Sequence, residues 1–284
     1  MSIETLLRKQ NRDGGWPYVR GGSWTEPTVY AVLALAASGA TAEAARGLGW
    51  IRASQRPDGG WPPCPGVEQS TWVTALIALL PPESLGEERH ARGIEWLLGS
   101  TGRESTFVYR LREWLIGNAR PRELEFAGWP WFPETAAWVA PTALSILALD
   151  KEFGRHPSRR LAGRIESGRC FLLRRACHEG GWNHGSVRDL AYDSRPYPET
   201  TGMALTALRG VESPQVERAL AVAGDFLGQC RSADALNWLR LGLMAHGRLG
   251  AGQGPPEIAF RTLSESSLSL LVAQTRQGGG PFWS

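Results

Sequence analysis

The sequence has few lysines and no long apolar run, and each shortage excludes something. Lys9 and Lys151 are the only lysines among 31 basic residues, and a net charge of +3 is too small to indicate a nucleic-acid partner. No stretch reaches the roughly 18 apolar residues of a membrane-spanning helix. The segment MSIETLLRKQNRDGG contains no apolar signal core. We therefore expect a cytoplasmic protein without a transmembrane segment, and the sequence leaves its oligomeric state open.

Cysteine is also scarce, and its spacing argues against disulfides. The four cysteines are Cys64, Cys170, Cys177 and Cys230, and no two form a CxxC pair. Cys170 and Cys177 are placed on one predicted helix, about 10 Å apart along its axis. This separation is too large for a disulfide bond, so we expect reduced, buried thiols.

Tryptophan, glycine and proline are instead abundant, with 13, 34 and 19 copies. Gly and Pro cluster between helical runs, so they mark turns and not disorder. In the stretch 50–80, a helical run ends at Gln55 and a Pro-Asp-Gly-Gly turn leads to Trp61. Glu68 then precedes a second helix rich in Ala, Leu and Thr. Trp61 is expected to fold back over the first helix as a structural residue.

This unit of helix, Gln, turn, Trp and second helix repeats along the chain with decay, which indicates a repeat protein. The first unit has helices at 3–9 and 26–38, the third is interrupted by an inserted segment at 101–125, and the sixth is degenerate. Second helices carry small residues that suit an inner wall, whereas first helices carry more Arg and Glu. The sequence thus predicts an all-α, closed α/α toroid of about six helix pairs, in preference to an open solenoid, as one domain over 1–284. The insertion is a candidate lid.

The second helices share a register in which an acid is expected to open each helix. These acids are Glu26, Glu68, Glu134, Glu199, Asp234 and Glu265. In five of the six helices a large residue follows four positions later, on the same helix face. These residues are Tyr30, Trp72, Trp138, Met203 and Trp238. Pro141 is expected to kink or loosen the third of these helices.

The segments IETLLRKQNRDGGW, GLGWIRASQRPDGGW and GRCFLLRRACHEGGW resemble the glutamine–tryptophan repeat of squalene–hopene and oxidosqualene cyclases. The β subunits of protein prenyltransferases share that toroid, and the resemblance covers most of the chain. The resemblance implies the fold far more firmly than any activity. The Asp-rich DxDD motif of the cyclases is absent, and so is the Asp, Cys and His zinc set of the prenyltransferases. We therefore expect no metal and no cofactor. Cys177, His178 and His184 remain a weak alternative as zinc ligands, since they supply at most three of the four that zinc needs.

The acids at one rim of a ring have two interpretations. Four of them, Glu26, Glu68, Glu134 and Glu199, are candidate catalytic groups, with Glu68 and Glu199 preferred. Like charges at an apolar rim raise carboxyl pKa values, and a retained proton can start a terpenoid cascade. The alternative is that they only complement helix dipoles.

The candidate substrate-binding residues are four aromatics, Tyr30, Trp72, Trp138 and Trp238, and two arginines, Arg110 and Arg112. The aromatics would present π faces to an isoprenoid or its cations in a central cavity; equally, they would be ordinary core. The arginines of the insertion would hold an acidic head group or form a solvated face.

Three functions follow as hypotheses. The first is an isoprenoid-binding toroid, a divergent cyclase- or prenyltransferase-like enzyme that uses a cavity carboxylate as its acid. The second is a non-catalytic isoprenoid-binding or scaffold protein. The third is a carbohydrate-active toroid in which paired carboxylates act and tryptophans stack on sugars.

Overall fold

Each turn tryptophan is buried and tied to two helices. Trp61 donates its indole N–H to the carbonyl oxygen of Ile51 at 2.8 Å, while its backbone N–H donates to Thr74 Oγ1 at 2.9 Å. The same two bonds recur in three other units. They join Trp16 to Leu6 and Thr28, Trp129 to Leu97 and Thr142, and Trp182 to Leu172 and Thr201. The tryptophan therefore fixes the end of one helix to the start of the next, and these four residues are structural.

The glutamine of the repeat connects one unit to the next. Gln55 donates to the carbonyl oxygens of Gly59 and Arg89, both at 2.9 Å. Gly93, one turn after Arg89, faces the Trp61 ring so closely that a Cβ there would come within 2.9 Å of a ring carbon. Neighbouring outer helices are therefore held together by a side-chain bond and by a glycine that admits the indole.

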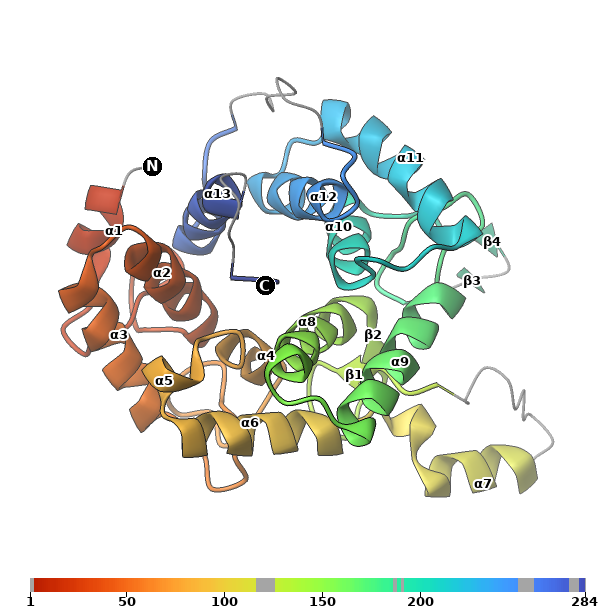
Figure 1. The fold of residues 1–284 in the computed structure, drawn as a ribbon, viewed down its shortest axis with the longest axis horizontal. Coiled ribbons are helices and arrows are strands. Elements are labelled where there is room, and N and C mark those ends of the chain that lie inside the picture. The colour runs from red at the N-terminus through yellow and green to blue at the C-terminus, as the bar shows by residue number, and fades with distance from the viewer. Residues whose placement is uncertain are drawn as a thin grey trace.

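The computed structural model describes residues 3–115, 126–185, 188–189, 192–249, 258–275 and 281–283. Within this part of the chain an inner ring of helices lies inside an outer ring (Figure 1). The inner helices are α2 (Thr25–Ala37), α4 (Val73–Ile77), α8 (Val139–Arg155), α10 (Pro198–Ala207), α12 (Ala233–Ala245) and α13 (Leu263–Thr275). The outer helices are α1 (Ile3–Lys9), α3 (Thr41–Ala53), α6 (Glu87–Gly99), α9 (Arg159–Arg174) and α11 (Pro214–Gln229). A short helix, α5 (Pro82–Leu85), precedes α6.

The ring is closed, because α13 packs against both α12 and α2 (Figure 1). The α/α toroid predicted from the repeats is thus confirmed, and an open spiral is excluded. The sixth unit is described only from Ile258 onward, and α13 is its inner helix. Every residue of α2 from Pro27 to Leu35 is buried, which is typical of a helix that is packed on all sides.

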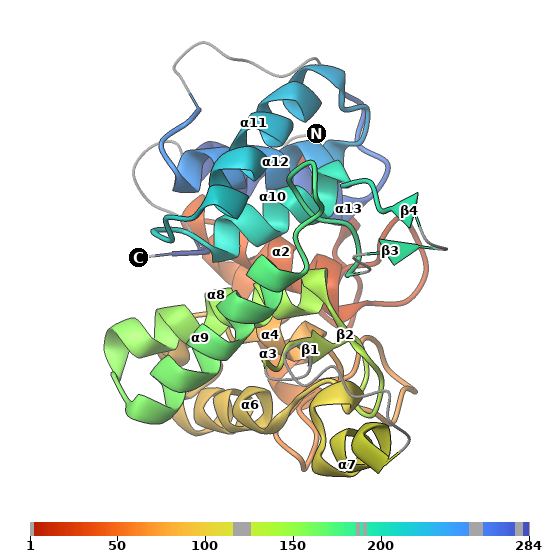
Figure 2. The ribbon, with the colours of Figure 1, turned by 90° about the vertical axis from the view of Figure 1, so that its right-hand side faces the viewer.

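The two faces of the ring differ. The inner helices begin on one face, where two short hairpins lie: β1 (Trp129–Pro130) with β2 (Ala137–Trp138), and β3 (Arg188–Asp189) with β4 (Tyr192–Asp193). The segment 281–283 lies at the centre of the ring and approaches from the opposite face (Figures 1 and 2). We call these the N-terminal face and the C-terminal face.

Two inner helices begin later than the acid register predicts. Glu68 precedes α4, which begins at Val73, and Glu134 precedes α8, which begins at Val139. In the third unit the reason is the β1–β2 pairing, which holds Ala137 and Trp138 extended. Pro141 consequently lies in the first turn of α8, where no backbone N–H bond is lost, so the expected disruption of this helix was wrong. The register holds for α2, α10, α12 and α13.

The insertion contains a 3-10 turn at Arg103–Ser105 and helix α7 (Phe107–Leu115). Helix α7 projects from the outside of the ring, away from its centre (Figure 1). Residues 116–125 lie outside the described part of the chain, so the lid remains a prediction.

Candidate functional site

Three carboxylates converge on the N-terminal face. Glu26, Glu199 and Asp234 occupy the first turns of α2, α10 and α12, and we call them the acid cluster. Burial raises the pKa of Glu26 from its ordinary 4.5 to about 7; a hydrogen bond from Tyr18 opposes this rise and the charge of Glu199 adds to it. The pKa of Asp234 is raised well above its ordinary value by burial and then by Glu199 and Glu26. Glu26 and Asp234 therefore keep their protons to a higher pH than isolated carboxylates do.

Tyr18 orients Glu26. Its hydroxyl donates to Glu26 Oε2 at 2.5 Å. Burial, and next the charge of Glu26, raise the pKa of Tyr18, so the phenol stays protonated and remains a donor. Glu26 is thus held in one position by a neutral partner that leaves its second oxygen free of this bond.

An aromatic strip leads to Glu199 at the rim. The rings of Trp138 and His184 have centroids 5.8 Å apart, and those of His184 and Tyr197 are 5.1 Å apart. Trp138 is 38% exposed and Tyr197 48%. Although the Glu199 side chain is itself exposed, desolvation raises its pKa, and His184 acts in the opposite direction. The strip offers ring faces to solvent beside a carboxyl group.

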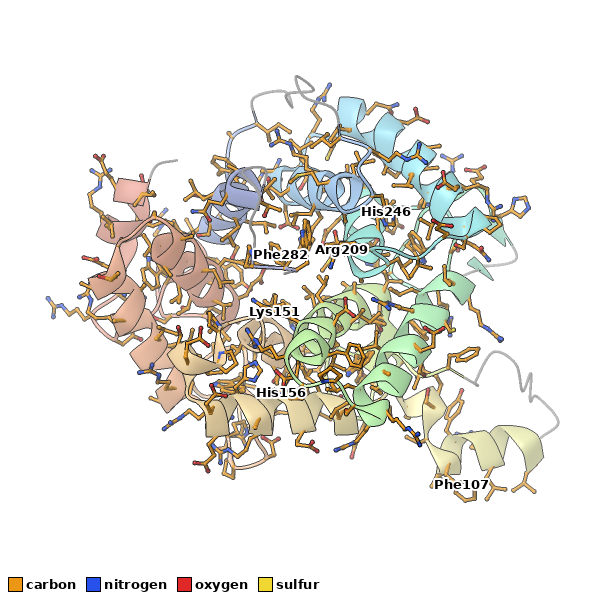
Figure 3. All side chains as sticks on the ribbon, in the orientation of Figure 1. Phe107, Lys151, His156, Arg209, His246 and Phe282 are labelled. Atoms are coloured by element: carbon orange, nitrogen blue, oxygen red, sulfur yellow. The ribbon has the colours of Figure 1, made fainter. Side chains whose placement is uncertain are left out.

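Large side chains lie one helical turn below the acid cluster. Tyr30 follows Glu26 by four residues and Trp238 follows Asp234 by four, and both are almost fully buried. Trp238 meets Phe282 edge-on, with ring centroids 5.3 Å apart. Phe282 comes from the central segment 281–283 and lies near the axis of the ring (Figure 3).

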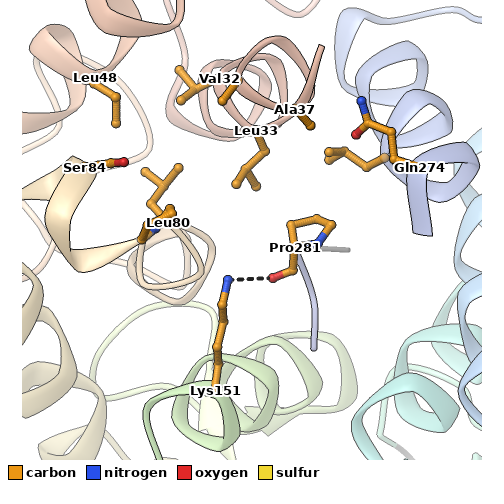
Figure 4. A pocket seen from close by; sticks show the side chains of 12 residues that line it. Val32, Leu33, Ala37, Leu48, Leu80, Ser84, Lys151, Gln274 and Pro281 are labelled. Atoms are coloured by element: carbon orange, nitrogen blue, oxygen red, sulfur yellow. Dashed lines mark hydrogen bonds between the residues drawn. The ribbon is translucent and has the colours of Figure 1, made fainter. Parts of the chain in front are cut away.

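A pocket of about 510 Å³ opens on the other side of this aromatic layer, toward the C-terminal face. Its walls come from α2, α3, the segment 80–84, α8, α13 and Pro281 (Figure 4). The lining residues are Val32, Leu33, Ala36, Ala37, Leu48, Leu80, Pro81, Ser84, Lys151, Leu271, Gln274 and Pro281. They include no acid, so the acid cluster and the apolar pocket are separate regions of one ring.

The four candidate catalytic acids do not come together. Glu26 and Glu199 belong to the acid cluster, whereas Glu68 is exposed in the segment before α4. Glu134 is also exposed; it has a positive φ of 66° and lines a second pocket of about 400 Å³ with Glu95 and Arg103. Their catalytic roles remain predictions, and the two acids that face one centre are the stronger candidates.

The four candidate aromatics also separate. Tyr30 and Trp238 lie below the acid cluster, while Trp138 lies at the rim. Trp72 is half-buried and packs edge-on against Trp131, at 5.0 Å between centroids. They form no single belt, because Trp72 and Trp138 precede the first residues of α4 and α8 and are not part of these helices. Of the arginines, Arg112 is exposed on α7, and the side chain of Arg110 lies outside the described residues.

Neither a metal cluster nor a membrane span is found in the described residues. Over those ranges, no group of three or more His, Cys, Asp and Glu side chains is placed to hold a metal ion. In these ranges no two of the four cysteines form a disulfide bond. Within the same part of the chain, no helix is both long and apolar enough to cross a bilayer.

Three residues of the acid cluster's surroundings, the aromatic layer and the pocket were not predicted from the sequence. Tyr18 follows the first turn tryptophan by two residues, and no repeat position marks it. Phe282 lies in the glycine-rich stretch read only as a degenerate turn. Lys151 carried a usable signal: it is one of two lysines and falls at the end of an apolar helical run.

No family model matches the chain, and no curated protein sequence matches it. Solved structures do resemble it. A GH8 endo-β-1,4-glucanase from an Achatina fulica gut metagenomic library has a TM-score of 0.65 at 13% identity, over 98% of each chain. The type II terpene cyclase MstE from Scytonema has a TM-score of 0.54 at 18% identity, over 99% of this chain and 78% of that one.

A GH76 α-mannanase from Bacteroides thetaiotaomicron has a TM-score of 0.60 at 9% identity, over 96% of this chain and 93% of that one. At these identities the likeness shows the fold alone. The chain therefore has an α/α toroid fold, which the solved terpene cyclase and glycosidases also have.

Proposed function

We propose that the protein binds a long apolar small molecule of the isoprenoid class inside the ring, and that the acid cluster supplies a proton to it. The observation that carries this proposal is the pocket of about 510 Å³, whose walls are mainly aliphatic. Small-molecule sites are typically apolar, concave and about 300–1,000 Å³ in volume. The repeat resemblance points to the same substrate class.

The two regions lie within reach of one extended chain. Glu26 and Leu33 are seven residues apart on α2, which is about 10 Å along the helix axis. Phe282 contacts Trp238 below the acid cluster, and its neighbour Pro281 lines the pocket. A ligand that reaches both regions therefore has to displace the Phe282 ring.

The proposed reaction is acid-initiated cyclisation or isomerisation. The proton moves from the Glu26 carboxyl oxygen to an alkene carbon, and the π electrons of the alkene form the new C–H bond. The cation left on the chain closes a ring or loses a proton to give an isomer. The π faces of Tyr30 and Trp238 lie one turn below and would stabilise such a cation.

A carbohydrate substrate is the second candidate, and a specific observation favours it. The exposed strip of Trp138, His184 and Tyr197 lies beside Glu199 on the N-terminal face. Exposed ring faces next to carboxyl groups suit sugar stacking and acid–base hydrolysis.

The experiment is a binding and turnover panel on purified protein. Farnesol, geranylgeraniol and squalene represent isoprenoids, and cellotetraose and mannotetraose represent sugars. Calorimetry measures binding and mass spectrometry identifies products. We expect an isoprenoid alcohol to bind in the micromolar range and the sugars not to bind. Sugar binding that is lost in Trp138→Ala would establish the second candidate instead, and isoprenoid binding without turnover would support a non-catalytic carrier.

A further inference from the structure

Lys151 is a cation in an apolar pocket. Its ammonium donates to the carbonyl oxygen of Leu79 at 2.7 Å and to that of Pro281 at 3.0 Å. Figure 4 shows the bond to Pro281. An ammonium group has three N–H donors, and the described residues supply no third acceptor. The side chain is half-buried, and among the described residues no carboxylate lies within ion-pair distance of its ammonium group.

The surroundings increase the cost of this charge. Burial lowers the pKa of Lys151 to about 8; repulsion from Arg155 contributes in the same direction, and Glu83 opposes it. At pH 7 the group is still mainly protonated. A buried cation without an anion is costly, and an anion brought into the pocket would recover much of that cost.

We propose that the pocket binds an isoprenoid or similar aliphatic chain that ends in a carboxylate, with the carboxylate on Lys151 Nζ and the chain along α2. This inference rests on the proposed function and adds the chemistry of the head group. The third N–H of Lys151 meets a carboxylate oxygen, while Val32, Leu33 and Leu80 cover the chain.

The geometry also orients the ligand. Lys151 belongs to α8 and the apolar walls come largely from α2, across the pocket (Figure 4). With the head group on Lys151, the far end of the chain points either to the pocket mouth or, past Phe282, toward the acid cluster. The carboxylate and the carbonyl oxygen of Pro281 would then accept from the same ammonium group, which places the head group beside the central segment.

The test compares farnesoic acid, farnesol and farnesylamine, which share one chain and differ in head group. At pH 7 we expect the acid to bind about tenfold more tightly than the alcohol, and the amine to bind most weakly. Lys151→Met should remove the difference between acid and alcohol, and Lys151→Arg should retain part of it. Lys9→Met is the matched control, because Lys9 lies on the outer helix α1.

A measurement on the unmodified chain guards against a variant that fails to fold. Protein labelled with [13Cε]lysine has two lysine signals, since Lys9 and Lys151 are the only lysines. Farnesoic acid should shift the Lys151 signal and raise the pH at which it titrates, leaving Lys9 unchanged. If farnesol and the acid bind equally and the Lys151 signal does not move, the carboxylate inference is wrong and the isoprenoid site stands. If no farnesyl compound binds, both are wrong.

Discussion

The two faces of the ring treat charge in opposite ways. On the N-terminal face, three carboxyl groups share one region; desolvation raises the pKa of all three, and repulsion from neighbouring acids raises the pKa of Glu26 and Asp234 further. On the C-terminal face, one lysine keeps its proton although the surroundings are apolar. In the function proposed above, the first region would supply a proton and the second would attract an anion. One elongated ligand would then meet an acidic end and a cationic end of the same ring.

Replacing Glu26, the strongest candidate acid, should give the largest difference between the two faces, because turnover should fall while binding at the pocket is kept. Glu26→Gln keeps an acceptor for Tyr18 but removes the proton, so any conversion of geranylgeraniol should fall by at least about 100-fold. Calorimetric affinity for the neutral alcohol at the pocket should change less than twofold. Glu68→Gln is the matched control, since that acid is exposed and lies outside the helix. Retention of more than half the turnover in Glu26→Gln would remove Glu26 from the mechanism.

The same substitution should change the pH dependence of stability. Folded Glu26 keeps its proton up to about pH 7, whereas an unfolded glutamate loses it near 4.5. The native state therefore binds more protons between these values, and the wild-type free energy of unfolding falls as pH rises through that window. Glu26→Gln should be more stable than wild type by about 3 kcal/mol at pH 8 and nearly equal to it at pH 4. Urea unfolding at both pH values measures this, and an equal difference at both would show that the carboxyl is not protonated in the fold.

Narrowing the pocket should give the smallest effect of the three changes, and it should alter ligand binding at the C-terminal face without altering the acid cluster. Ala36 lines the pocket on α2, and Ala36→Phe places a ring at its mouth. We expect farnesol affinity to fall about tenfold. The pH dependence of the free energy of unfolding, to which the acid cluster contributes, should not change. Ala45→Phe, at an exposed alanine of the outer helix α3, is the control. Unchanged affinity in Ala36→Phe would place the ligand elsewhere.

The sequence predicted the repeat architecture well because its causes are local. A glutamine, a glycine turn and a tryptophan specify one helix-to-helix connection, and the bonds of Trp61 to Ile51 and Thr74 recur in unit after unit. The small residues of the second helices were enough to assign them to the inner wall. The glycine that admits the Trp61 indole, Gly93, was not predicted, because it lies on the next outer helix along the chain and not in the unit of Trp61.

The site was predicted less completely, because it depends on where helices start and on contacts across the ring. Glu68 and Glu134 share the sequence register of Glu26, but a later helix start removes each of them from the rim. Lys151 and Pro281 line the pocket from segments 130 residues apart, a proximity that the repeat pattern does not encode. The local repeat pattern therefore predicts which helices form the inner wall, whereas contacts between distant segments determine which side chains face the centre of the ring.

The packing of α13 on α2 makes the first and last inner helices neighbours. Gln274 on α13 donates to the carbonyl oxygen of Ala34 across 240 residues of chain. Every other interface between inner helices joins segments much closer in sequence, so this seam carries the largest loop-closure entropy of the ring. We therefore expect the packing of α13 on α2 to form late in folding. The pocket has walls from both of these helices, so it is complete only when the ring is closed.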